Sequence, residues 1–365
     1  MKILTILDKY IIKKFLGTYV FSIILIISIS VVFDINERLD KFLNNNAPLK
    51  DIVFDYYMNF IPYYTNLFSA LFVFIAVIFF TSKLADNSEI IAMLSNGMSF
   101  RRLMKPYMIS AGLIAIFSFF LNSFIIPPAN VTRINFQNKY IKDKSKEYAT
   151  GVQLQVDEGV ILYLDRFDNK TREGHRFALD KFEDKELKSR LIAPNIKYDS
   201  AYQWTLSNYS IRTFEGMREI ITTGEKMDTT INVVPSDFLV AENDYEQMTT
   251  PKLYDYIQRQ KAKGLANVGG VSMIQFEIEF HKRFASIFSA FILTIIGASL
   301  SARKVKGGMG LNIGIGLGLS VSYIMFQTVS SSFAVSGALP PMLAVWVPNI
   351  IYMFIAAYLY SKAPN

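Results

Sequence analysis

Six long apolar segments constrain the fold of this chain more than any other feature. An α-helix of about 20 apolar residues crosses the hydrocarbon core of a bilayer, so each segment is long enough to form a membrane span. The first is too long for a secretory leader and has no small-residue cleavage site after it, so we expect it to be retained. The six predicted spans are residues 13–33, 62–82, 107–127, 284–302, 310–334 and 342–361.

Charge divides the chain into membrane and non-membrane parts. Residues 129–270 hold 21 Lys and Arg against 21 Asp and Glu, so the net charge of +7 belongs to the rest of the chain. There the basic residues gather at one set of helix ends, in residues 2–14, 83–105 and 303–306 and at Lys362. By the positive-inside rule, both termini are predicted to be cytoplasmic and residues 129–270 periplasmic. Because the inserted domain is neutral, we do not expect nucleic-acid binding.

The order of the segments predicts three regions. Residues 1–128 carry three transmembrane helices, 129–270 an inserted periplasmic domain with flanking helices, and 271–365 three more transmembrane helices. Within the insert, "VQLQVDEGVILYLDRF" alternates apolar and polar residues on both sides of a "DEG" turn, which is typical of half-buried antiparallel strands. The predicted fold class is therefore an α-helical membrane protein with six transmembrane helices and an inserted all-β, jelly-roll-like domain.

The sequence lacks the residue patterns of common catalytic and cofactor sites. It has no cysteine, its two histidines (His175 and His281) lie far apart, and no HExxH motif occurs. The dipeptide Gly-Lys is absent, which excludes a Walker A phosphate loop. We therefore expect a chain that is not itself an enzyme and that holds no metal or cofactor of its own.

A charged stretch, "DNSEIIAMLSNGMSFRRLMKP" at residues 86–106, connects the second and third spans. Asp86 and Glu89 have capping-box spacing, an apolar stripe follows, and Gly97 ends the predicted helix. This pattern fits an ordinary capped loop, and it also fits a short cytoplasmic coupling helix over 86–97 that docks a soluble ATPase. The candidate coupling residues are Glu89, Ile90, Met93, Leu94 and Gly97.

Basic residues recur at the predicted outer boundary of the membrane. Asp34, Arg38 and Lys41 share one helix face. Such cations can bind phosphate or carboxylate head groups, although exposed ion pairs and snorkelling anchors have the same pattern. The candidate lipid-binding residues are Arg38, Lys41, Arg133, Lys139, Lys282 and Arg283.

Three glycines repeat at four-residue spacing in the fifth span. Gly310, Gly314 and Gly318 form a small-xxx-small pattern, which allows membrane helices to approach closely. We predict that these glycines pack helices rather than bind a nucleotide.

Four segments resemble the LptF/LptG family of lipopolysaccharide-export permeases, and the resemblance runs along nearly the whole chain. They are "LDKYIIKKFLGTY", "SEIIAMLSNGMSFRRLMKP", "IIPPANVTRINFQNKY" and "EFHKRFASIFSAFILTIIGASLSARK". The first two are the more specific, and "LDKYI" with "SEIIAM" favours the LptG-like half. The resemblance implies a chain that pairs with a second LptF/LptG-type permease, an LptB-like ATPase dimer that binds ATP and magnesium, and an LptC/LptA-like periplasmic bridge protein.

The resemblance also implies site roles and a location. Glu89 would contact the ATPase, and Arg38 and Lys41 would help to hold lipid A phosphates. Arg133 falls where similar permeases carry basic residues, but Gln137 follows in place of a second Arg. The expected function is extraction of lipopolysaccharide from the bacterial inner membrane. The alternatives are a permease of another ABC exporter or mechanotransmitter, an ATP-independent envelope scaffold, and a lipid-modifying enzyme.

Overall fold

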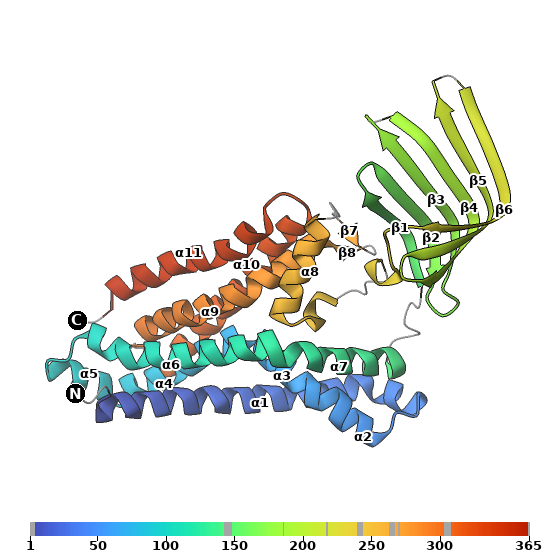
Figure 1. Ribbon diagram of the computed structural model, residues 1–365. Helices are drawn as coiled ribbons and strands as arrows, with labels where there is room; N and C mark the ends of the chain where they lie inside the picture. The colour runs from blue at the N-terminus through green and yellow to red at the C-terminus, as the bar shows by residue number, and fades with distance from the viewer. Residues whose placement is uncertain are drawn as a thin grey trace. The chain divides into compact units, whose positions relative to one another are not determined.

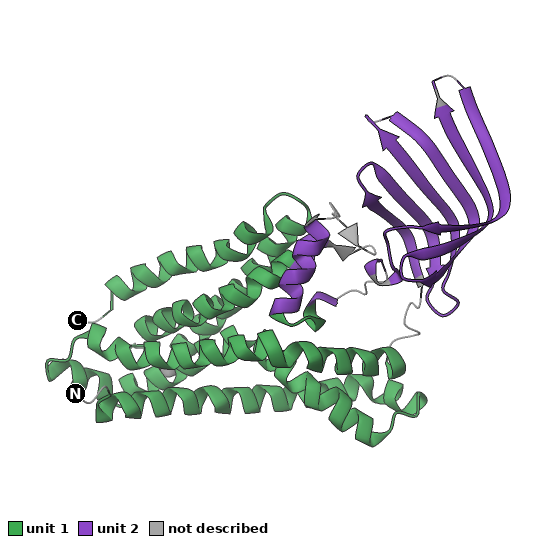
Figure 2. Cartoon of the chain, viewed as in Figure 1, with its two compact units in different colours: residues 1–141, 246–250, 277–365 green, residues 142–245, 251–276 purple. Residues whose placement is uncertain are grey.

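The computed structural model describes residues 4–141, 148–184, 186–216, 218–238, 244–262, 267–268, 271–302 and 308–363. The chain forms two compact units (Figure 2). The membrane unit comprises residues 1–141, 246–250 and 277–365, and the sheet unit comprises 142–245 and 251–276. The predicted basic segment 303–306 and Lys2 lie outside the described residues.

The membrane unit is built from helices, and Figure 1 labels most of them. Before the sheet unit come α1 (Ile6–Asn44), α2 (Leu49–Asp51), η1 (Ile52–Tyr57), α3 (Met58–Leu67), α4 (Ser69–Asp86), α5 (Glu89–Ser95), α6 (Phe100–Phe120), η2 (Leu121–Ile125) and α7 (Ile126–Tyr140). After it come α9 (Met273–Ser301), α10 (Gly308–Val335) and α11 (Pro341–Ser361).

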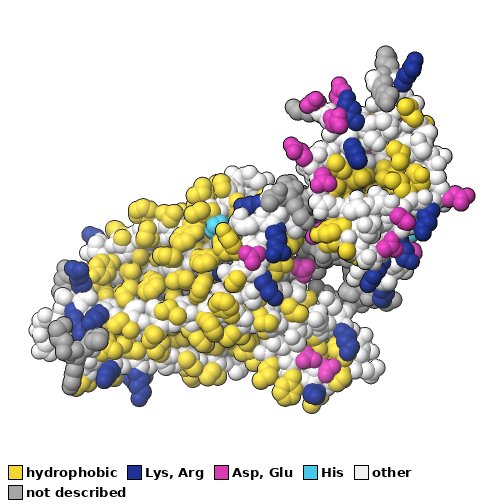
Figure 3. All heavy atoms as spheres, in the orientation of Figure 1, with side chains coloured by type: hydrophobic (Ala, Val, Ile, Leu, Met, Phe, Trp, Pro, Cys, Tyr) yellow, Lys and Arg dark blue, Asp and Glu magenta, His cyan; other side chains and the backbone are white. Residues whose placement is uncertain are grey.

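The described part of the chain contains six helical segments long and apolar enough to cross a membrane, which confirms the prediction. Hydrophobic side chains cover the middle of the membrane unit on the face shown in Figure 3. The helix α1 has 39 residues, and at 1.5 Å per residue it is about 58 Å long. Because a hydrocarbon core is only about 30 Å thick, α1 extends well beyond it.

The second and third spans have different bounds from those predicted. The predicted 62–82 segment is divided at Phe68, where α3 ends and α4 begins. The helix of the third span continues past Pro127 and Pro128, because the π-turn η2 leads into α7, which ends at Tyr140. Prolines are tolerated in the first turn of a helix, where their missing N–H groups need no partner.

Three apolar clusters hold the membrane unit together. One joins α1, α4, α5 and α6 around Phe15, Phe80 and Tyr107. A second joins α4, α9, α10 and α11. The third is aromatic, with Tyr56 and Phe136 among its members, and it packs η1 and α3 against α7 and the last turns of α1. The clusters link every spanning helix to a neighbour.

The sheet unit contains a six-stranded antiparallel sheet whose strands pair in chain order. Its strands are β1 (Tyr148–Asp157), β2 (Val160–Asp168), β3 (Glu173–Glu183), β4 (Glu186–Ser200), β5 (Gln203–Glu215) and β6 (Arg218–Thr230). The short elements η3 (Pro235–Asp237), β7 (Asn267–Val268) and β8 (Val271–Ser272) complete this unit. Three elements cross the boundary between the units: η4 (Asp244–Gln247), α8 (Thr250–Ala262) at its first residue, and α9 after Phe276.

The inserted antiparallel sheet confirms the predicted fold class. The "DEG" turn is present, because Asp157 pairs with Val160 and Gly159 has φ +71°. The strands have 9 to 15 residues, and chain-order pairing makes the sheet a meander. Trp204 and Phe167 are buried on one face, and the Trp204 indole N–H donates to the Val233 carbonyl at 3.0 Å. The segment after β6 therefore covers part of that face.

Candidate functional sites of the membrane unit

The short helix α5 is held in place by apolar contacts on one side. Ile90 is fully buried, and Met93 and Leu94 pack against the same core cluster of α1, α4 and α6. The predicted capping box of Asp86 and Glu89 is wrong. Asp86 is the last residue of α4, and the N-cap of α5 is Ser88, which has φ +61° and makes no side-chain cap.

The two ends of α5 turn sharply. Ser88 and Gly97 both have positive φ, and at Gly97 the angle is +84°. Glycine adopts this conformation without the steric cost that other residues meet. The helix is therefore a compact unit between two tight turns, which agrees with the predicted end at Gly97.

Glu89 is half-buried and binds within the chain. Its Oε2 accepts a hydrogen bond from the Tyr10 hydroxyl at 3.1 Å, and its Oε1 accepts one from the Asn87 side-chain amide at 3.2 Å. These contacts orient the carboxylate relative to α1. Contact between Glu89 and an ATPase stays a prediction.

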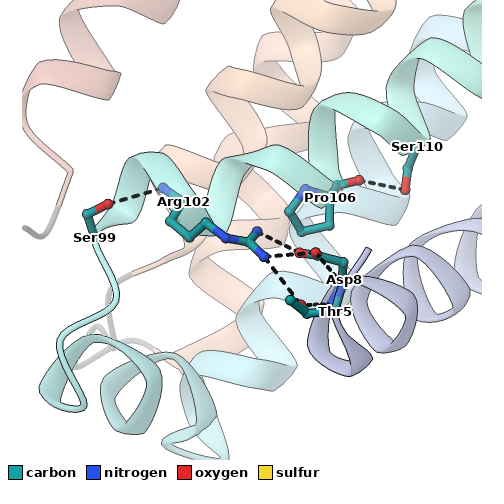
Figure 4. Close-up of polar contacts among 6 residues, drawn as sticks. All are labelled: Thr5, Asp8, Ser99, Arg102, Pro106 and Ser110. Atoms are coloured by element: carbon teal, nitrogen blue, oxygen red, sulfur yellow. Dashed lines mark hydrogen bonds and ion pairs between the residues drawn. The ribbon is translucent and has the colours of Figure 1, made fainter. Parts of the chain in front are cut away.

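A second polar contact joins α1 to α6 close to α5 (Figure 4). The Arg102 guanidinium donates to both carboxylate oxygens of Asp8, at 2.6 and 2.8 Å, and also to the Thr5 hydroxyl at 3.3 Å. Asp8 is 1% exposed. Its carboxylate also accepts from the Thr5 backbone N–H, so it belongs to the capping box that starts α1. Paired charge-assisted bonds of this kind are among the strongest polar contacts in proteins.

At the far end of α1, Arg38 is engaged by its own chain. Its Nε donates to Asp34 Oδ1 at 2.7 Å, and its guanidinium lies 5.7 Å from the centre of the Tyr56 ring. Asp34 is buried and also accepts from the Tyr56 and Tyr57 hydroxyls. Arg38 is therefore less available to a ligand than Lys41, which is exposed in the last turn of the same helix.

The basic residues of α7 divide in the same way. Arg133 is 6% exposed, and its Nε donates to Asn130 Oδ1 at 3.2 Å. Its guanidinium also lies over the Tyr63 ring, 4.2 Å from the centroid, a typical cation–π arrangement. Lys139 is exposed and lies over the Tyr140 ring. Lys41 and Lys139 are thus the two predicted lipid-binding cations that the structure leaves exposed.

A polar cavity of about 90 Å³ lies inside the membrane unit, between α3, α4, α6, α7, α9 and α10. Lys282, Glu279, Glu246 and Asn130 line part of it. Burial raises the pKa of the Glu246 carboxyl, and the negative charge of Glu279 raises it further. The Tyr63 hydroxyl donates to Glu246, and that contact lowers the pKa, but burial outweighs it.

Arg283 has a structural role and is not available as a cation for a ligand. It is 1% exposed, its Nε pairs with Glu279 at 3.0 Å, and its Nη1 donates to the Met248 carbonyl and the Thr250 hydroxyl. These bonds fasten residues 248–250 to α9. Arg283 was predicted from position alone, and position does not show which cations the chain itself neutralises.

The predicted packing glycines face open space among the described residues. A Cβ added to Gly310, Gly314 or Gly318 would meet no heavy atom within 4 Å. Gly316 has the packing role instead, because its Cβ would lie 2.0 Å from Ile78 Cδ1 of α4. The four-residue repeat therefore does not face α4, and close packing of these three glycines against another chain stays a prediction.

Within the ranges that the structure describes, no three His, Cys, Asp or Glu side chains form a metal-binding group. The described sites instead consist of ion pairs, tyrosine hydroxyls and exposed lysines around apolar helices. This chemistry suits the binding of anionic head groups and the transmission of movement between helices.

A family model described as the lipopolysaccharide export system permease LptF/LptG matches residues 9–362, nearly the whole chain. The chain belongs to the LptF/LptG family. No curated protein matches it. As an LptF/LptG permease with six candidate spans, the chain is a multi-pass transport subunit rather than an enzyme.

Several residues of this LptF/LptG chain were missed by the sequence analysis. Thr5 and Asp8 have capping-box spacing, which was a usable signal, but Arg102 was counted only as one of several basic loop residues. Tyr63 and Glu246 are 183 positions apart, so no local pattern could have paired them.

Proposed function

We propose that this chain is one permease half of an ABC transporter that extracts lipopolysaccharide from the bacterial inner membrane and passes it to a periplasmic bridge protein. A second LptF/LptG-type permease would form the other half, and a separate LptB-like ATPase dimer would bind and hydrolyse ATP. The observation that carries this proposal is the family match over residues 9–362, on a chain with six candidate spans and an inserted sheet.

The proposed orientation places α5 and both termini in the cytoplasm and the sheet unit in the periplasm. On the face shown in Figure 3, the charged side chains visible at the α5 end of the membrane unit are Lys and Arg, and both signs of charge are visible at its other end. This asymmetry supports the orientation by the positive-inside rule.

We further propose how the sites act. α5 would receive movement from the ATPase through Glu89, and the apolar contacts of Ile90 would pass that movement to the helix bundle. Lys41 and Lys139 would attract the phosphates of the lipid, since exposed cations at head-group height interact favourably with anions.

The test is purification of the native chain and of Glu89→Ala from their own membranes, with identification of the proteins and lipids that accompany each. The native chain is expected to bring an LptB-like ATPase, a second permease and lipopolysaccharide. Glu89→Ala is expected to lose the ATPase about tenfold, because it loses a charged contact, while the second permease remains.

A matched control is Glu37→Ala, because Glu37 is also a glutamate of the membrane unit and is exposed. It should retain every partner. Native chain that purifies with the ATPase but without lipopolysaccharide would contradict the proposed cargo. Glu89→Ala that retains the ATPase at native levels would contradict the role of Glu89.

A further inference from the structure

The helix α1 is bonded to both sides of the α5 turn. On one side the Tyr10 hydroxyl donates to Glu89, the first residue of α5. On the other side Asp8 accepts two bonds from Arg102, in the first turn of α6. We name these two contacts, Tyr10–Glu89 and Asp8–Arg102, the α1 clamp. Movement of α5 would act on the Tyr10–Glu89 contact directly and on the Asp8–Arg102 contact through the turn that joins α5 to α6.

The Asp8–Arg102 contact is suited to keep the ends of α1 and α6 together when either helix moves. The Asp8 side chain is almost completely buried, and its carboxylate is also bonded to the Thr5 backbone N–H. The planar guanidinium fork bonds both carboxylate oxygens, which fixes the angle between the groups as well as their distance. Pulling Arg102 away would therefore disrupt the first turn of α1 as well as the ion pair.

The α6 side of this contact is equally well anchored. Arg102 lies in the first turn of α6, where the Ser99 hydroxyl accepts from its backbone N–H at 3.3 Å (Figure 4). Its side chain is thus tied to α1 while its backbone belongs to the capped end of α6. The clamp joins the ends of two helices, and these ends have little freedom to move separately.

The helix α1 can carry such movement over a long distance. It continues for 39 residues with no proline, and its far end carries the Asp34–Arg38 pair and Lys41. Helices kink sharply at prolines, at Gly/Ser pairs and at π-bulges, and α1 has no proline or π-turn, while its one glycine, Gly17, is not next to a serine. Displacement of its first turn is therefore passed toward the end with the exposed lysine.

We propose that the α1 clamp transmits movement of the coupling helix α5 directly to α1. Movement of α5 would then reach the outer end of α1 as well as α4 and α6. Asp8, Tyr10 and Arg102 are positioning residues in this scheme, since they act through helix α1. The inference rests on the proposed function, because it assigns these residues to the step that links ATP hydrolysis to lipid movement.

The first experiment uses the complete transporter in liposomes and measures ATP hydrolysed and lipopolysaccharide delivered in the same sample. Arg102→Lys keeps the positive charge but loses the paired bonds, and Tyr10→Phe loses only the hydroxyl that reaches Glu89. For Arg102→Lys we expect the ratio of lipid to ATP to fall about tenfold, a common size for coupling between sites. Tyr10→Phe should lower the ratio less, because a single hydrogen bond is lost.

Arg101→Lys is the matched control, because Arg101 is the preceding arginine and is exposed. Its ratio should equal that of the native transporter. A native ratio in Arg102→Lys would overturn the inference, and so would equal losses in Arg101→Lys and Arg102→Lys. A purely structural ion pair would lower the yield of complex without changing the ratio per assembled complex, and that result would also overturn it.

A second measurement leaves the contacts of the α1 clamp intact. Because the chain has no cysteine, spin labels can be attached at Lys9→Cys on α1 and Arg101→Cys on α6, both of which are exposed. The distance between the labels should stay the same in nucleotide-free and ATP-trapped complexes, since the clamp moves the two helix ends together. A distance that changes between these states would overturn the inference.

The two proposals fail in different ways. If the native transporter hydrolyses ATP but delivers no lipopolysaccharide, the proposed cargo is wrong, and the label distance still reports on the clamp. If the native transporter delivers lipid and Arg102→Lys does so with the same ratio, the clamp inference is wrong while the proposed function stands.

Discussion

At the residue scale, Glu246 shows how burial governs an acidic group of the membrane unit. Its pKa is raised above the ordinary value of 4.5 because burial disfavours the charged carboxylate. Between 4.5 and the raised value, the folded chain keeps the proton that the unfolded chain has lost, so the free energy of unfolding falls as pH rises.

The prediction concerns Glu246→Gln, which cannot ionise but retains an oxygen that can accept from the Tyr63 hydroxyl. We expect thermal unfolding of the purified chain in detergent to show a smaller loss of stability from about pH 5 to about pH 8 than in the native chain. At the higher pH the variant should be the more stable of the two.

Glu225→Gln is the control, because Glu225 is exposed on β6 and should leave the pH profile unchanged. Parallel profiles for the native chain and Glu246→Gln would refute the role of burial. A less stable Glu246→Gln at the higher pH would show instead that attraction to Arg133 and Lys282 outweighs the burial of the carboxylate.

At the element scale, the contact between α4 and α10 depends on one glycine. A side chain at position 316 would collide with Ile78 Cδ1 at 2.0 Å and would lie 3.2 Å from Phe74 Cε1. We expect Gly316→Leu to lower the free energy of unfolding by about 1–3 kcal/mol, the usual cost of overpacking a filled core. Denaturant titration of the purified chain measures this change.

Gly314→Leu provides the comparison, because it lies on the same helix and its added side chain would meet no atom of this chain. Its stability as an isolated chain should match or exceed the native value, since glycine disfavours helices. Equal losses at positions 314 and 316 would show that helix propensity, rather than the α4 contact, governs both.

The elements themselves could be predicted well, and their ends less well. The apolar length of a span and the two-residue alternation of a strand are local properties, so six spans and an antiparallel sheet followed from the sequence. The division of the second predicted span at Phe68 did not follow, because no proline or glycine marks that position. The N-terminus of α5 also differed, since Ser88 adopts a left-handed conformation that the capping pattern does not reveal.

The candidate sites depended on which cations are neutralised by acids of the same chain. Arg38 and Arg283 were grouped with Lys41 because all three lie near the predicted outer boundary of the membrane. The buried acids that neutralise them, Asp34 and Glu279, separate the paired cations from the exposed ones. Helical spacing of i and i+4 was the available signal for both pairs, and it should weigh against a free cation.

At the scale of the whole molecule, the two ends of the membrane unit differ in the signs of their visible charged side chains. In the view of Figure 3, the charged side chains visible at the α5 end are Lys and Arg, whereas both signs of charge are visible at the opposite end. At that opposite end Arg38, Arg133 and Arg283 are each engaged by side chains of the membrane unit, so an anionic lipid would meet mainly the exposed lysines. Fewer cations are therefore available to bind an anionic lipid than the sequence contains.

This argument predicts that Lys41 contributes to lipid binding and that its reversal to glutamate weakens that binding. In the purified transporter, Lys41→Glu should lower the amount of lipopolysaccharide that cross-links to α1 by about tenfold, because attraction to the phosphates becomes repulsion. The difference from the native chain should shrink at high ionic strength, since salt screens interactions between exposed charges.

Lys50→Glu on α2 is the matched control, because it makes the same charge change at another exposed lysine. An equal loss of cross-linking in both variants would mean that the overall charge of this end attracts the lipid, without a specific contact at Lys41. Reversing Arg38 instead would not separate these cases, because the change would also leave Asp34 buried without its cation. The exposed lysine therefore gives the decisive comparison.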